Sequence, residues 1–111
     1  MRYEMRLHDI PFKKIQSGTK TIEMRLYDDK RQMIQIGDEI EFTSRTSGEK
    51  QVTEVIGIHL YNSFEEIYRD YDKVSLGYDI DEEASFTDLE KYYSKEEQKK
   101  FGVIGIEIKN I

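Results

Sequence analysis

Short segments in which apolar and polar residues alternate are the feature that most constrains the fold of this chain. In residues 1–7, Met, Tyr, Met and Leu alternate with Arg, Glu and Arg, and in residues 39–43 Ile40 and Phe42 alternate with glutamates. A period of two is typical of a strand with one buried face. Similar patterns predict three further strands, at residues 19–26, 51–60 and 103–108, so we expect about five strands.

Residues that start and end helices lie between these strands. Asp9 is placed as an N-cap, Pro11 fits a first helical turn, and Gly18 is a typical residue just past a helix end. Three segments after the fourth strand have the Ser/Thr-x-x-Glu spacing of a capping box, beginning at Ser63, Thr87 and Ser94. Helices are therefore predicted after the first and fourth strands, which indicates an α+β fold with a small, strongly curved sheet or barrel.

Composition favours one cytoplasmic domain over residues 1–111. Hydrophobic residues make up 37% of the chain and charged residues 36%, and no segment has the composition of a linker. Cysteine is absent, which excludes disulfides, thiolate metal sites and cysteine nucleophiles. The sequence lacks both a signal-peptide pattern and an apolar run of about 20 residues, so a membrane partner is not expected.

The net charge of −6 is unevenly distributed along the chain. Residues 1–55 carry 10 Lys/Arg and 10 Asp/Glu, whereas residues 56–111 carry 7 and 13. The second half would repel a polyanion, so any contact with nucleic acid must be local and must use the first half. Non-specific coating of DNA is not expected. His8 and His59 lie on different segments without ligands at metal spacing, so no metal site and no cofactor are predicted.

Polar residues alternate with apolar ones in the predicted strand at residues 19–26. A period of two places three apolar residues on the core face and puts Glu23 and Arg25 together on the opposite, outward face. Lys20, beside Gly18 at the mouth of the strand, can point to either side. From these residues alone, the outward face is either a solvated surface with a weak ion pair or a small polar site.

Residues 18–25, Gly-Thr-Lys-Thr-Ile-Glu-Met-Arg, resemble the signature Gly-x-Lys-x-x-Glu-x-Arg of ASCH domains, which belong to the PUA-like superfamily. The resemblance continues in chain order through four more segments, residues 36–42, 60–67, 92–94 and 101–106. It implies a PUA-like barrel of five to six strands, with flanking helices and a cleft between barrel and helices. Members of the family are thought to bind RNA or nucleotides in that cleft.

The resemblance implies that Lys20, Glu23 and Arg25 lie in the cleft. Lysine and arginine suit a phosphate or the acceptor edge of a base, and a glutamate can accept from an exocyclic amine. Arg25 is either a second donor or the clamp that holds Glu23. Tyr61 and Tyr78 either stack on a base or pack in the core. We expect an RNA- or nucleotide-binding module that is a monomer or a weak homodimer.

Two other classes of function stay open. The chain is similar to small bacterial amidohydrolases that remove the acyl group from acetylated cytidine, which would make Lys20 the base and Glu82 the proton shuttle. Glu23 occupies the position where those enzymes carry a threonine, so the expected hydroxyl is missing. Nuclease activity has been proposed for other relatives. ASCH modules also occur in transcription coactivators, which keeps a protein-interaction adaptor in transcription or translation open.

Overall fold

Five strands form one curved sheet in the computed structural model, which describes residues 1–111. They pair in the order β1-β3-β4-β5-β2, and only β1 and β3 are parallel. The strands are Arg2–Leu7 (β1), Ile22–Leu26 (β2), Glu39–Ser44 (β3), Lys50–Tyr61 (β4) and Val103–Asn110 (β5). The predicted α+β fold with a curved sheet and flanking helices is confirmed, and the sheet is an open half-barrel with β1 and β2 at its edges.

The long strand β4 joins the two halves of the curved sheet. Its first residues pair with β3 and its later residues with β5, and the register shifts between Val55 and Gly57. Such a bulge bends a strand and increases its twist. A Cβ atom at residue 57 would lie 2.9 Å from Oε1 of Glu107, so a larger residue there would have to displace that side chain.

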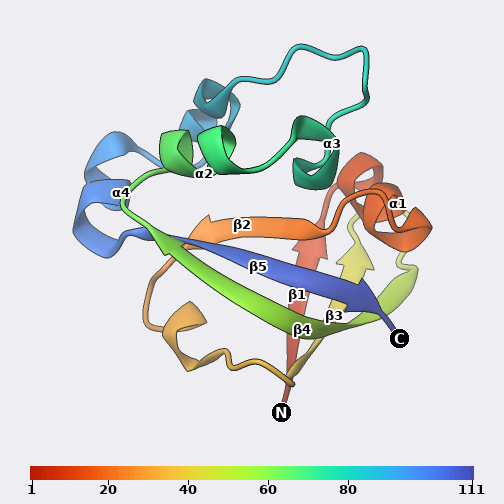
Figure 1. The fold of residues 1–111 in the computed structure, drawn as a ribbon. Coiled ribbons are helices and arrows are strands. Elements are labelled where there is room, and N and C mark those ends of the chain that lie inside the picture. Colours follow the sequence, from red (N-terminus) through yellow and green to blue (C-terminus); the bar gives the residue numbers. More distant parts are fainter.

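Helices cover one face of the sheet and one end of it. The α-helices are Asp9–Ser17 (α1), Phe64–Asp70 (α2), Lys73–Leu76 (α3) and Lys95–Phe101 (α4), and the 3₁₀ segments are Arg31–Met33 (η1) and Phe86–Lys91 (η2). Figure 1 shows α2 and α3 above β2, with α1 beside the sheet. None of the helices has the length and apolar character that crossing a membrane requires.

Apolar side chains are buried on both faces of the sheet. One cluster joins Phe12 and Ile15 of α1 to strands β1, β3, β4 and β5. The second joins the apolar side of β2 to Phe64 and Ile67 of α2 and to Leu76 of α3. The predicted core face of the second strand is therefore correct, and it packs against the helices.

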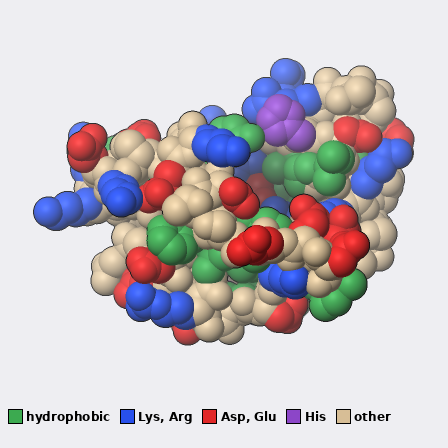
Figure 2. Space-filling model, turned by 90° about the horizontal axis from the view of Figure 1, so that it is seen from above, with side chains coloured by type: hydrophobic (Ala, Val, Ile, Leu, Met, Phe, Trp, Pro, Cys, Tyr) green, Lys and Arg blue, Asp and Glu red, His purple; other side chains and the backbone are tan.

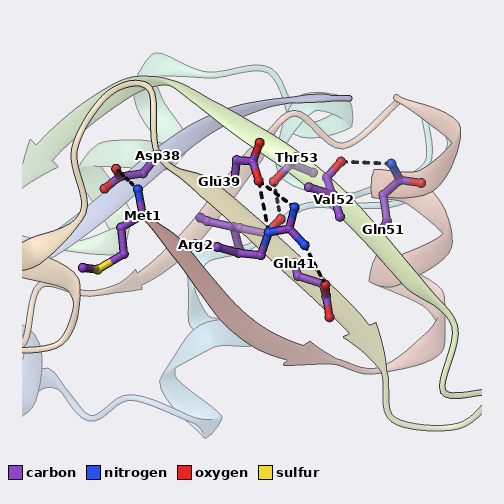
Figure 3. Close-up of polar contacts among 9 residues, drawn as sticks. Met1, Arg2, Asp38, Glu39, Glu41, Gln51, Val52 and Thr53 are labelled. Carbon is purple, nitrogen blue, oxygen red and sulfur yellow. Dashed lines mark hydrogen bonds and ion pairs between the residues drawn. The ribbon is translucent and has the colours of Figure 1, made fainter.

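The parallel pairing of β1 with β3 brings the carboxyl ends of these two strands to the same end of the sheet. At their amino ends, Arg2 donates to Glu39 at 2.7 Å and to Glu41 at 3.3 Å, as Figure 3 shows. At their carboxyl ends, Leu7 lies opposite Ser44. This register places the residues that follow β1 and β3 side by side.

The start of the second strand differs from the prediction. Regular strand geometry begins at Ile22 and not at residue 19, because the amides of Thr19 and Lys20 both donate to the carbonyl of Lys14, at 3.0 Å. Gly18 is the left-handed C-cap of α1, as predicted, with φ 87°. Hydrogen bonds to the last turn of α1 thus fix the backbone of the turn as far as Lys20.

Helix starts also differ in part from the prediction. His8 and not Asp9 is the N-cap of α1, because the Asp9 carboxylate accepts from Oγ of Ser44 at 2.9 Å. Of the three predicted capping boxes, only the one beginning at Ser94 forms. Ser63 makes no side-chain cap bond, and η2 begins after Ser85 and not after residue 87.

Candidate functional site

Three charged side chains meet on β2 and the turn before it. Oε1 of Glu23 lies 3.2 Å from Nζ of Lys20, and Oε2 accepts from Nε of Arg25 at 2.9 Å. Only 3% of Glu23 and 9% of Lys20 are exposed. The three polar residues of the signature therefore form a buried ion triad, in which Arg25 is a clamp on Glu23.

The prediction that Glu23 and Arg25 face outward was wrong. In the pairing of β2 with β5 they lie opposite Ile106 and Ile104, and directly opposite side chains share one face of a sheet. Both isoleucines belong to the cluster that packs on α1. The open sheet curves over this face so that a side chain of one edge strand reaches the other: Nη2 of Arg25 on β2 donates to the carbonyl of Arg6 on β1 at 3.4 Å.

Charge compensation keeps Glu23 ionised although it is buried. Burial alone would raise the pKa of Glu23, but the cations of Lys20 and Arg25 outweigh it and hold this pKa below its ordinary value. Burial opposes the charge of Arg25 too, yet the carboxylate of Glu23 raises the pKa of Arg25. Every buried side-chain polar atom, those of the triad included, has at least one hydrogen-bond partner.

Helix α3 holds Lys20 in place from the opposite side. The amide of Thr21 donates to the carbonyl of Ser75 at 3.0 Å, which ties the end of the turn to α3. Gly77 follows α3 with φ 112°, and a Cβ atom there would lie 3.0 Å from Cδ of Lys20. The lysine side chain can pack here because residue 77 is a glycine.

The triad borders a cleft of about 570 Å³ between the edge strands and the helical layer. This volume lies within the range of small-ligand sites. Its other polar and aromatic walls come from the ends of β1 and β3, from α2 and from the segment after α3: Arg6, His8, Arg45, Tyr68, Tyr78, Tyr92 and Tyr93. Figure 2 shows this face of the molecule as hollowed, with a histidine and basic side chains along one rim and acidic side chains on the opposite side.

The cleft is basic although the chain carries a net charge of −6. Four cationic residues line it, Lys20, Arg25, Arg6 and Arg45, and Glu23 is the only acidic residue in the lining. Field lines from like charges are concentrated in a concave site with low-dielectric walls. The lining of the cleft therefore has the opposite sign of charge from the chain as a whole.

Tyrosines form the wall that faces the strands. Oη of Tyr78 lies 2.7 Å from Oη of Tyr68 and donates to Asp88 at 2.8 Å. Burial, together with these bonds, raises the pKa of Tyr78, so its phenol stays neutral. Tyr92 is 64% exposed at the cleft and offers a free aromatic face. Tyr78 thus lines the cleft with the triad, and its hydroxyl is fully engaged within the protein.

Two other candidate residues lie away from the triad. Tyr61 lines a different hollow, beside Lys99 and Lys100, and its hydroxyl donates to Asp70 at 2.8 Å. Glu82 is exposed, and its Oε1 lies 3.3 Å from Nζ of Lys14, not beside Lys20. The structure therefore does not bring Glu82 and Lys20 together as an acid–base pair. No cluster of three His, Asp or Glu side chains is arranged to hold a metal ion.

Arg6 and Arg45 are residues of the site that were not predicted from the sequence. Arg6 reads as an ordinary exposed residue of an alternating strand, and Arg45 as part of a turn. They line the same cleft because β1 and β3 are parallel neighbours, and the amide of Arg45 donates to the carbonyl of Leu7 at 2.8 Å. A parallel pairing of strands so far apart in the sequence has no local sequence signal.

Comparisons with solved structures reveal the same fold. The crystal structure of the hypothetical protein PH0355 has a TM-score of 0.84 and 34% sequence identity, and the similarity covers the whole of both chains. The solution structure of protein PF0455 from Pyrococcus furiosus has a TM-score of 0.73 and 35% identity, covering 100% of this chain and 98% of that one. An ASCH domain from Lactobacillus crispatus has a TM-score of 0.69 over 98% of this chain and 79% of its own, and at 13% identity it shows the fold alone.

Family membership follows from the sequence match. No protein with a curated description has a matching sequence. The family model for the ASCH domain, however, matches residues 5–111, which is nearly the whole chain. The chain therefore belongs to the ASCH domain family.

Proposed function

We propose that the cleft beside Lys20, Glu23 and Arg25 binds single-stranded RNA or a nucleotide-like ligand. The observation that carries this proposal is the buried ion triad at the edge of the cleft. Replacing a buried ion cluster by apolar residues of similar volume is often neutral or stabilising, so stability alone does not account for it. Titratable groups with shifted pKa values are typical of functional sites.

The triad retains hydrogen-bonding capacity for a ligand. A guanidinium has five N–H donors, and the hydrogen bonds of Arg25 to Glu23 and to the carbonyl of Arg6 use only Nε and Nη2. Oε1 of Glu23, which has Lys20 as its one partner, also has a second lone pair. A donor and an acceptor side by side match the Watson–Crick edge of a base. Membership in a PUA-like family supports RNA as the ligand class.

The exposed tyrosine at the cleft supports a single strand as the ligand. Unstacked bases bind proteins by stacking on aromatic side chains, a contact worth about 1–3 kcal/mol per base. Tyr92 is well placed for such stacking, because it combines high exposure with a position in the cleft wall. A duplex would keep its base faces covered and would gain nothing from this side chain.

Fluorescence anisotropy with a labelled single-stranded RNA octamer of mixed sequence tests the proposal. We expect Lys20→Met and Tyr92→Ala each to lower the affinity about tenfold, the loss of roughly one stacking or charged contact. Raising the salt from 50 to 200 mM should weaken binding about twentyfold if three cations contact phosphates. Arg69→Gln, which removes an equal charge from an exposed pair with Glu65, is the control and should change little.

Two results of that experiment would contradict the proposal. One is the absence of RNA binding at millimolar protein concentration. The other is RNA binding that neither the cleft variants nor salt affects, because an adaptor surface that binds through apolar contacts would behave in that way. Circular dichroism of each variant shows whether the fold is intact, and Tyr92→Ala leaves the triad untouched.

No observation favours hydrolysis of acetylated cytidine. Nζ of Lys20 is held in the ion pair with Glu23, and Glu82 bonds to Lys14 on the outside of the molecule. Acetate release from acetylcytidine by the purified protein, lost in the Lys20→Met variant, would reinstate that reading.

A further inference from the structure

We infer that Arg6 and Arg45 form a phosphate subsite of the cleft, so the ligand is a nucleotide or a phosphodiester and not a free nucleoside. This inference rests on the proposed function, because it assigns the part of the same ligand that lies outside the triad.

The two arginines are the only ones in the chain without an acidic partner. The chain has six arginines, and four of them are in ion pairs: Arg2 with Glu39, Arg25 with Glu23, Arg31 with Asp28 and Arg69 with Glu65. The side chains of Arg6 and Arg45 form neither an ion pair nor a hydrogen bond, and both line the cleft. Acidic residues outnumber basic ones in this chain, 23 to 17. Two unpaired arginines that share one concave site therefore point to an anion from outside the chain.

The backbone brings these arginines together beside the triad. The amide of Arg45 donates to the carbonyl of Leu7 at 2.8 Å, and Nη2 of Arg25 donates to the carbonyl of Arg6 at 3.4 Å. Arg25 on β2 and Arg45 after β3 thus both bind the backbone at the carboxyl end of β1. A guanidinium binds phosphate through two parallel N–H donors, and a pair of them can surround its oxygens.

The opposite wall of the cleft defines how a nucleotide would lie. Tyr78, Tyr92 and Tyr93 form that wall, and none of them carries a charge that would attract phosphate. The only carboxylate in the cleft, that of Glu23, already contacts Lys20 and Arg25 and so repels phosphate less than a free carboxylate would. The base therefore lies between the tyrosines and the triad, and the phosphate lies at the carboxyl ends of β1 and β3.

Titration calorimetry with nucleosides and their phosphorylated forms tests this assignment. The probes are adenosine, cytidine, guanosine and uridine, their 5′-monophosphates, and the four dinucleoside monophosphates with two identical bases. For the preferred base, we expect a phosphorylated form to bind at least about tenfold more tightly than the nucleoside, as one charge-assisted contact provides. Tighter binding of the monophosphate indicates a terminal phosphate, and tighter binding of the dinucleotide indicates a phosphodiester; either result supports the subsite.

Variants of Arg6 and Arg45 test whether these arginines cause the tighter binding of the phosphorylated form. In the double variant Arg6→Gln/Arg45→Gln, the phosphorylated form should bind no more tightly than the nucleoside, while nucleoside binding stays at the wild-type level. Both side chains are exposed and without partners, so the fold should be retained. Arg69→Gln is again the matched control and should leave every affinity unchanged.

The possible failures of the inference and of the proposed function are distinct. Equal binding of nucleoside and nucleotide, or a preference for the nucleotide that survives in the double variant, would overturn the phosphate subsite and leave the proposed function intact. If none of the probes binds at millimolar concentration, the proposed function itself fails, and the subsite with it.

Discussion

At the scale of single residues, Glu23 is the group on which the buried triad depends. Its removal leaves the cations of Lys20 and Arg25 without a counter-charge in a buried environment. Breaking a buried pair in this way costs about 3–5 kcal/mol. We therefore expect Glu23→Gln to lower the free energy of unfolding by about that amount, as measured by urea denaturation.

A surface pair provides the comparison for that variant. Glu65 and Arg69 form an exposed pair at 3.2 Å, four residues apart on α2. Glu65→Gln should cost less than about 1 kcal/mol, since exposed pairs contribute little. Equal losses for the two variants would mean that the triad is not a buried, coupled cluster.

The low pKa of Glu23 predicts how the stability of the protein depends on pH. Because this pKa is lower in the folded state than its ordinary value of 4.5, the unfolded chain binds the proton first as the pH falls. The stabilisation by ionised Glu23 is therefore fully present above about pH 5 and is lost as the pH falls through the pKa of the folded state. The stability difference between wild type and Glu23→Gln should shrink below pH 4.5 in urea titrations. A difference that grows in acid would contradict this sign.

Gly77 determines the position of Lys20. Gly77→Ala places a Cβ atom 3.0 Å from Cδ of Lys20 and forces alanine into a left-handed conformation. We expect it to cost more than Gly37→Ala, where φ is 95° and nothing lies within 4 Å, so only the backbone cost of about 1–2 kcal/mol applies. RNA affinity should fall in Gly77→Ala and stay unchanged in Gly37→Ala. An equal loss of stability in both variants would show that a Cβ atom at residue 77 does not clash with the Lys20 side chain.

At the scale of elements, one helix cap can be tested against a matched control. Ser94 accepts from the amide of Glu97 at 3.1 Å, and Glu97 accepts from the amide of Ser94 at 3.0 Å, which completes the capping box of α4. Ser94→Ala should therefore cost about 1 kcal/mol in urea denaturation. Ser63→Ala, at the start of α2, should cost much less, because Ser63 makes no cap bond. A reversed order of these two losses would contradict the assignment of the caps.

The individual strands and helices could be predicted from the sequence better than the way in which the strands pair. Alternation identified all five strands, and Gly18 identified the end of α1, because these signals are local. The pairing of β1 with β3 depends on residues more than 30 positions apart, and nothing in either segment specifies it. The same holds for the site. The signature in residues 18–25 predicted the residues of the triad, whereas Arg6 and Arg45 come to the site only through the pairing of β1 with β3. The burial of Glu23 was missed because the covering of its face arises from the curvature of the whole sheet.

At the scale of the whole molecule, the lining of the cleft differs in charge from the chain as a whole. The chain is acidic overall, yet basic side chains gather along one rim of the hollow in Figure 2, and four cationic residues but only one carboxylate line the cleft. The hollow beside Tyr61 also contains lysines, but it contains the carboxylates of Glu65 and Glu90 as well. This contrast predicts one preferred site for an anionic strand, the cleft of the triad.

Amide chemical-shift mapping with the single-stranded RNA octamer tests this claim most directly. The account predicts that saturating RNA shifts the signals of residues 20–25 together with those of Arg6 and Arg45, while residues around Tyr61 and Lys99 stay in place. Signals that remain unchanged at millimolar RNA, or shifts confined to the Tyr61 hollow, would contradict it.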